Sequence, residues 1–99
     1  MESKITYQFS AKIWKHGETG GWHFVSLPKD ISKEIRMYNS QLEEGWGRMK
    51  ATATINSFLW ETAIWFDTKQ DTYLLPLKAE VRKKEKLAIN DTIIVQIKI

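Results

Sequence analysis

The chain has 99 residues, a length that allows one hydrophobic core and excludes two independent ones. Hydrophobic residues make up 42% and charged residues 27%, a balance typical of folded globular chains and far from that of disordered ones. The formal net charge of +3 permits contact with polyanions without requiring it. The lack of cysteine excludes disulfides, thiolate nucleophiles and cysteine-based zinc sites. We therefore predict one domain over residues 1–99.

The first half of the chain predicts two strands followed by a helix. Apolar side chains occupy the odd positions from 5 to 13, an alternation typical of a half-buried strand. A glycine-containing loop at 17–21 separates this segment from strand-forming residues at 22–27, so we expect a hairpin. After Pro28, with Asp30 placed as an N-cap, apolar residues recur at the spacing of a short amphipathic helix: Ile31, Ile35, Tyr38 and Leu42.

The second half predicts mostly strands. Residues 48–55 place Met49, Ala51, Ala53 and Ile55 on one face, and a polar turn at 67–71 separates two further extended segments in a second hairpin. A basic helical segment at 78–86 and a turn at Asn90-Asp91 complete the order. We expect four strands here: 48–55, 58–66, 72–77 and 92–99. The chain is therefore predicted to be mainly β, with two short helices.

A strand, a proline and a helix follow one another twice, because Phe24-Val25-Ser26-Leu27-Pro28 has a counterpart in Tyr73-Leu74-Leu75-Pro76. Proline suits this junction, since the first helical turn needs no partner for its N–H groups. The second unit, with Val81-Arg82-Lys83 and the segment 87–93, is similar to the swapped-hairpin AbrB-like transition-state regulators of bacteria. That resemblance implies a barrel that binds DNA and to which two chains contribute one unit each.

Three segments carry a second resemblance that covers nearly the whole chain: Gly21-Trp22-His23-Phe24-Val25-Ser26-Leu27-Pro28, Gly45-Trp46-Gly47-Arg48, and Tyr73-Leu74-Leu75-Pro76-Leu77-Lys78 with Val81-Arg82-Lys83. In these segments the sequence resembles the bacterial family labelled domain of unknown function 1905. The resemblance implies a double-split β-barrel built from two related strand-proline-helix units, with no established activity. The sequence departs from the family at Ala63, where serine is usual, and at Asn90, where glycine is usual.

Five tryptophans are many for so short a chain, and an aromatic cleft lined by some of them would stack a planar ligand. Trp22 and Trp46 adjoin glycines at predicted loop mouths, where a pocket would open. Trp60 and Trp65 lie within a predicted strand, so we expect them to fill or cover the core. The alternative for the whole set is core packing.

Polar residues near these loops extend the hypothesis. We predict a ligand site formed by Trp22, His23, Trp46, Arg48 and Lys78, in which the cationic side chains orient an anionic group at the rim. The alternative is that His23 faces solvent and that Arg48 pairs with a carboxylate.

A dense positive run follows Pro76, and basic residues on a helix can neutralise phosphates of a nucleic acid. Its members are Arg82, Lys83, Lys84 and Lys86. The alternative is a solvated helix face, favoured by Glu80, four residues before Lys84, and by Glu85 within the run.

No nucleophile elbow, phosphate loop, dinucleotide fingerprint or metal-ligand spacing is present, so we predict no catalytic residues, metal or cofactor. Enzymatic activity stays open, because acid–base pairs assembled by folding leave no linear motif. The leading hypothesis is a non-enzymatic module that binds a small anionic or planar ligand or a protein segment. The alternative is a nucleic-acid-binding regulator that uses the basic helix. A purely structural domain is a third possibility.

The sequence also predicts where the protein acts. It has neither the features of a signal peptide nor about 20 consecutive apolar residues to span a bilayer, so we expect a cytoplasmic protein that does not contact membranes. Open strand edges can pair with a second chain, which leaves a monomer and a weak dimer as alternatives.

Overall fold

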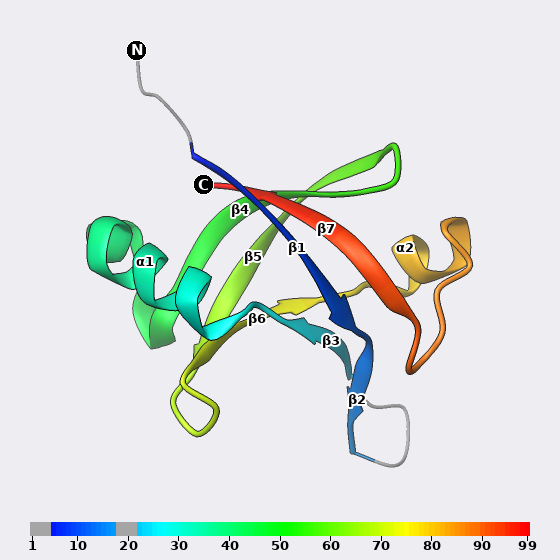
Figure 1. The fold of residues 1–99 in the computed structure, drawn as a ribbon, viewed down its shortest axis with the longest axis horizontal. Helices are drawn as coiled ribbons and strands as arrows, with labels where there is room; N and C mark the ends of the chain where they lie inside the picture. The colour runs from blue at the N-terminus through cyan, green and yellow to red at the C-terminus, as the bar shows by residue number, and fades with distance from the viewer. Residues whose placement is uncertain (1–4, 18–21) are drawn as a thin grey trace.

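The computed structural model describes residues 5–17 and 22–99, and of Ser40 and Trp46 it describes the backbone alone. Seven strands form one antiparallel sheet that curls strongly into a half-barrel, with helices α1 (Lys29–Asn39) and α2 (Ala79–Lys84) at opposite ends (Figure 1). Neither helix is long or apolar enough to cross a membrane. The strands are β1 (Thr6–Lys12), β2 (Trp14–His16), β3 (Trp22–Ser26), β4 (Arg48–Ile55), β5 (Phe58–Asp67), β6 (Thr72–Pro76) and β7 (Thr92–Lys98).

The strand predicted at 5–13 is divided in the structure. β1 pairs with β7, β2 pairs with β3, and the fully buried Ile13 lies between them. The Ile13 N–H donates to the Asp91 carbonyl at 2.9 Å, and the Asn90 N–H donates to the Ile13 carbonyl at 2.8 Å. Asn90 adopts φ 75°, the left-handed turn that asparagine tolerates. Because β1 and β2 stand at the two ends of the strand order β1-β7-β4-β5-β6-β3-β2, Ile13 holds these ends together.

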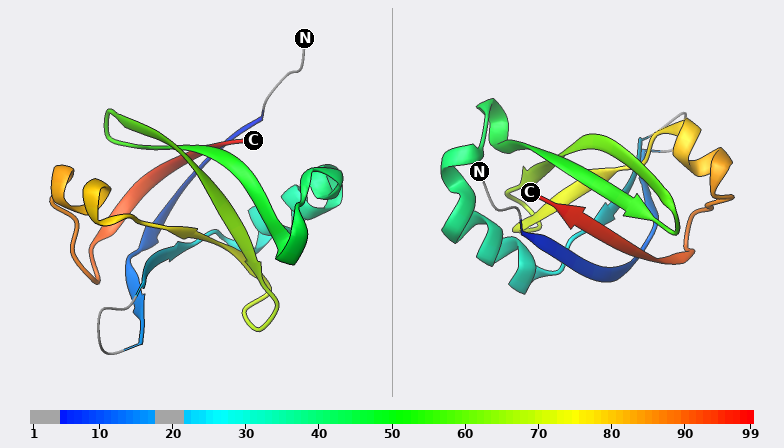
Figure 2. Two further views of the ribbon diagram at one scale, coloured as in Figure 1. Left: turned by 180° about the vertical axis from the view of Figure 1, so that it is seen from behind. Right: turned by 90° about the horizontal axis from the view of Figure 1, so that it is seen from above.

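The core lies inside the curl of the sheet, which Figure 2 shows from behind and from above. All four predicted apolar residues of β4 are buried, from Met49 to Ile55 at alternate positions. β7 contributes its own alternating set, and the helices contribute Ile35 and Val81, both almost fully buried. Each fully buried side chain of this size stabilises the fold by about 1.5–3 kcal/mol.

The first helix differs from its prediction. α1 begins at Lys29, so Asp30 lies in the first turn, where its carboxylate accepts a hydrogen bond from the Ile31 N–H at 2.9 Å. Tyr38 is 63% exposed and Leu42, beyond the helix, is 48% exposed, so the predicted apolar stripe is wrong beyond Ile35. The helix instead turns Ser32 and Ile35 toward the sheet, because the Ser32 hydroxyl accepts a hydrogen bond from the backbone of Tyr73 at 3.0 Å.

The two predicted strand-proline-helix segments lie side by side, but the prediction that their prolines correspond is wrong. Pro28 directly precedes α1, whereas Pro76 is the last residue of β6 and lies three residues before α2. β3 pairs with β6 with Val25 opposite Leu75. The Leu27 N–H donates to the Tyr73 carbonyl at 2.9 Å, and the Leu77 N–H donates to the His23 carbonyl at 2.8 Å. Exchanging β3 with β6 turns one of these two hydrogen bonds into the other, which is the pattern of a local two-fold rotation.

Strand β5 has neighbours on both sides over only part of its length. It pairs with β4 from Phe58 to Trp65 but with β6 only from Trp65 to Asp67. The predicted second hairpin therefore forms, but its ladder is short. Before Trp65, β5 separates from β6, while β6 continues along β3 toward α2.

Gly47 ends the 3-10 turn η2 (Gly45–Gly47) before β4, at φ +73°. A Cβ atom there would lie 3.2 Å from the Cβ of Phe66, whereas one at Gly45 would meet nothing within 4 Å. We expect Gly47→Ala to lower the free energy of unfolding by about 1–2 kcal/mol, because the left-handed backbone disfavours a Cβ. Gly45→Ala is the matched control and should change it far less. Urea unfolding measures both, and equal losses would contradict this role of Gly47.

Candidate ligand-binding site

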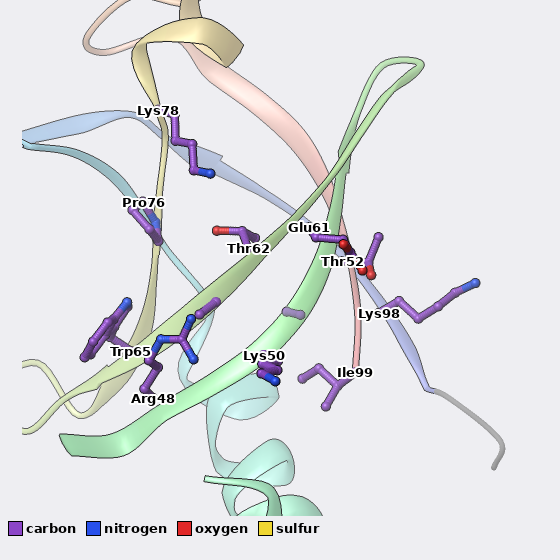
Figure 3. Close-up of a pocket in the computed structure, with 12 residues that line it drawn as sticks. Arg48, Lys50, Thr52, Glu61, Thr62, Trp65, Pro76, Lys78, Lys98 and Ile99 are labelled. Atoms are coloured by element: carbon purple, nitrogen blue, oxygen red, sulfur yellow. The ribbon is translucent and has the colours of Figure 1, made fainter. Parts of the chain in front are cut away.

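A cavity of about 540 Å³ lies over β4 and β5, where β5 has separated from β6. Figure 3 shows Pro76 and Lys78 on one side of Thr62, and Lys98 and Ile99 on the other. Its volume falls within the range of about 300–1,000 Å³ that is usual for small-molecule pockets. Its lining residues are Arg48, Lys50, Ala51, Thr52, Glu61, Thr62, Ala63, Trp65, Pro76, Lys78, Lys98 and Ile99.

The register of three strands assembles much of this lining. Arg48 stands opposite Trp65, and Lys50 opposite Ala63. Thr52 is flanked by Glu61 of β5 and Lys98 of β7. Because successive side chains of a strand point to opposite faces, the burial of Met49, Ala51 and Ala53 turns the alternate residues of β4 away from the core.

The side chains that line the cavity are mostly cationic where they are charged, with four basic side chains and one acidic side chain, Glu61. Arg48 forms an ion pair with Glu44, and the Lys50 Nζ lies 3.9 Å from the second oxygen of the same carboxylate. Among the residues that the structure describes, Lys78 and Lys98 form no ion pair with a carboxylate. The positive potential is therefore only partly offset, and this arrangement favours an anion.

Trp65 is the aromatic residue of the cavity, 39% exposed and 5.8 Å from its ring centroid to the Arg48 guanidinium carbon. The prediction that Trp60 and Trp65 both fill or cover the core is right for Trp60, which is buried, and wrong for Trp65. The two lie five positions apart on one strand, so they point to opposite faces. That odd spacing was the signal in the sequence that Trp65 faces away from the core.

The structure brings together two members of the predicted site, Arg48 and Lys78. Trp22 and His23 lie on β3 and do not line this cavity: Trp22 is 69% exposed and stacks near Phe24, with ring centroids 6.4 Å apart. The side chain of Trp46 and the loop residues 18–21 lie outside the described residues. Lys50, Thr52, Glu61, Trp65 and Lys98 line the cavity and were not predicted.

The basic segment after Pro76 is partly engaged with the protein itself. The Arg82 Nε donates to the Leu77 carbonyl at 3.2 Å, and the Lys84 Nζ lies 5.8 Å from the centroid of the Phe58 ring. Lys83, Lys84 and Lys86 are exposed. Glu85 accepts a hydrogen bond of 2.6 Å from the Asn56 amide, so this carboxylate ties α2 to the β4–β5 turn.

A second cavity, of about 340 Å³, lies beside α1 and is lined by three cations and two carboxylates, those of Asp30 and Asp71. The Arg36 guanidinium lies 3.9 Å from the centroid of the Phe66 ring, and its Nε is 3.5 Å from Glu43. Glu43 also accepts a hydrogen bond of 2.6 Å from the hydroxyl of Tyr73. The near balance of charge and these internal contacts indicate a structural cluster.

Within residues 5–17 and 22–99, no three His, Asp or Glu side chains lie close enough together to hold a metal ion.

Comparison with known proteins gives one result: residues 9–97 match the sequence model of a family described as a domain of unknown function (DUF1905). No curated protein matches the sequence. The family description states no activity.

The hydroxyl of Tyr73 provides a test of the structural cluster that it forms beside α1 with Glu43 and Arg36. Burial, and next the carboxylate of Glu43, raise the pKa of the Tyr73 hydroxyl well above its ordinary value near 10. Because the folded state holds this proton more tightly, the interaction stabilises the fold fully below pH about 10 and is lost as the pH rises further. Ultraviolet titration should show the Tyr73 phenolate only as the protein unfolds in alkali.

Tyr73→Phe removes the titrating group and is the control for assigning that signal. The same phenolate signal in Tyr73→Phe, or a phenolate of Tyr73 formed in the folded protein near pH 10, would contradict the assignment.

Proposed function

This chain belongs to the DUF1905 family, and we propose that it is a binding module that holds a small organic anion in the cavity over β4 and β5. The observation that carries the proposal is that four basic side chains and a single acidic side chain line one cavity. The basic side chains come from β4, from the segment after β6 and from β7, which folding brings together from distant parts of the sequence.

Like charges placed side by side reduce the stability of a sheet unless something offsets them. Glu44 offsets Arg48 and Lys50 from outside the cavity. Lys78 and Lys98 line the cavity on either side of Thr62; in Figure 3 the Lys78 side chain extends toward Thr62 and that of Lys98 extends away from it. A bound anion would supply the negative charge that the ion pairs of the described residues do not supply to these two lysines. The hydroxyls of Thr52 and Thr62 add hydrogen-bond donors to the lining from opposite faces of the sheet, because Thr52 stands opposite Glu61 and Thr62 is the next residue of β5.

The split of β5 belongs to a larger pattern, for which we propose a double-split β-barrel of two related strand-proline-helix units. The exchanged hydrogen bonds of Leu27 and Leu77 support this arrangement. So does the matching start of each helix two residues beyond those leucines, at Lys29 and Ala79. In both halves a long strand changes its neighbour partway, near Ile13 in the first half and near Trp65 in the second.

Nucleic acid is the second candidate, supported by three exposed lysines on and directly after α2: Lys83, Lys84 and Lys86. It is the weaker one, because the Arg82 guanidinium is hydrogen-bonded to the Leu77 carbonyl and Glu80 and Glu85 lie within the same basic segment. The two candidates differ in their response to salt: binding of a nucleic acid through many phosphates falls steeply as the salt concentration rises, and binding of a small anion with one phosphate falls less.

We expect small organic phosphates or carboxylates to raise the melting temperature at both low and moderate salt. Lys98→Met should weaken such a ligand about tenfold by calorimetry, which corresponds to ~1.4 kcal/mol. Lys78→Met should do the same. Each variant removes a charge and keeps an unbranched side chain.

Lys12→Met is the matched control, because Lys12 is an exposed lysine of β1 outside the cavity lining. Its ligand affinity should equal that of the unmodified protein. Equal weakening in all three variants would show a nonspecific charge effect and would refute this site. Stabilisation by duplex DNA or RNA alone, and only at low salt, would favour α2 instead.

A further inference from the structure

Two tryptophans occupy matching positions at the places where the long strands change neighbours. Trp14 of β2 stands opposite Phe24 of β3, and Trp65 of β5 stands opposite Leu74 of β6. Two residues beyond those partners, β3 carries Ser26 and β6 carries Pro76. The two surroundings therefore differ in hydrogen-bonding capacity, although the strand geometry is the same.

In the first half the tryptophan is fully engaged. The Trp14 indole N–H donates to the Ser26 hydroxyl at 2.9 Å, and the ring packs against Phe24 with centroids 5.2 Å apart. In the second half Pro76 has no hydroxyl to accept this bond, and Leu74 offers no ring. The Trp65 ring instead lines the cavity, beside Pro76 and Arg48 (Figure 3).

From this difference we infer that the anion carries a flat aromatic ring and belongs to the class of nucleoside phosphates, with the ring stacked on Trp65. This inference rests on the proposed function of the cavity. An exposed tryptophan face is a sequence-tolerant platform for a nucleobase. Arg48, already neutralised by Glu44, lies at this end, so the ring end of the cavity carries less unbalanced charge than the remainder.

The end of the cavity at Lys98, beyond Glu61, suits the phosphate. Trp65 and Glu61 lie four residues apart on β5, which is about 13 Å at 3.3 Å per residue. Lys98 lies across Thr52 from Glu61, and Lys50 lies between the two ends. A single-ring acid is too short to use both ends, whereas a base joined through a sugar to a phosphate is long enough.

Glu61 independently favours a ligand that contains a sugar. Its carboxylate repels an unbroken polyphosphate, but it accepts hydrogen bonds from hydroxyl groups, the role that an acidic residue has toward ribose in dinucleotide-binding folds. The cavity therefore combines a stacking surface, hydroxyl-binding groups and cations in one place.

The test compares the four common nucleoside monophosphates with ribose 5-phosphate and inorganic phosphate by calorimetry. We expect at least one nucleotide to bind about tenfold more tightly than ribose 5-phosphate and to quench tryptophan fluorescence. Trp65→Leu should abolish that preference and leave the affinity for ribose 5-phosphate unchanged. Trp22→Leu is the matched control, because Trp22 is exposed but lies outside the cavity.

Pro76→Ser is a second variant, which gives Trp65 the hydroxyl that Trp14 has. It should reduce nucleotide affinity several-fold while the melting temperature shows that the protein is folded. Ser26→Ala should leave nucleotide affinity unchanged, because it acts in the other half.

If ribose 5-phosphate binds as tightly as every nucleotide, the stacking of an aromatic ring on Trp65 is refuted, and the proposed anion site is retained. If none of the phosphates binds, and a panel of carboxylates also fails, the proposed function fails with it. Equal loss of nucleotide affinity in Trp22→Leu and Trp65→Leu would refute the role of Trp65.

Discussion

The buried joint at Ile13 is the constraint on which the rest of the structure depends. Its two backbone hydrogen bonds, to Asn90 and Asp91, fasten the first segment of the chain to the turn before β7. On one side of this joint the chain pairs with β7, and on the other with β3. A sheet whose two end strands are one continuous segment has to curl, and its curl creates the interior that the apolar faces fill. A buried backbone group without a partner would be costly, so the reciprocal bonds are what allow the strand to break there.

The same geometry explains why the cavity lies on β5. A strand that leaves one neighbour for another cannot remain paired on both edges, and the space beside it is filled by whatever side chains the sequence supplies. In the first half Trp14 and Ser26 occupy this space, and the two side chains are joined by a hydrogen bond. In the second half Trp65, Pro76 and lysines occupy it and leave an opening. The two halves share a framework and differ in how completely it is closed.

Local pattern was enough to predict the elements, because alternation and turn residues act over a few positions. It placed β4 with its observed bounds and found both helices. It could not reveal the break at Ile13, since the apolar alternation continues through that residue and only the change of partner interrupts the strand. The face of α1 was misjudged because a serine, Ser32, occupies the buried stripe and is held there by a backbone group of β6.

The site was harder to predict for the same reason. Arg48 and Lys78 were found through segments that resemble a known family, but Lys50, Thr52 and Lys98 sit at alternate, outward positions where polar residues are ordinary. Only the register between β4, β5 and β7 places them side by side, and register depends on partners distant in sequence. Trp65 alone could have been recognised, from its odd spacing to the buried Trp60.

Glu44 has a consequence for selectivity. Its carboxylate lies outside the cavity and forms ion pairs with Arg48 and Lys50. A ligand that used these two of the four cations would have to compete with Glu44. A ligand with one negative charge gains little by replacing a carboxylate that is already in place. A doubly charged group can draw on Lys78 and Lys98 and still compete for the pair that Glu44 holds. Under the proposed function, this fixed counter-charge therefore favours doubly charged anions over singly charged ones.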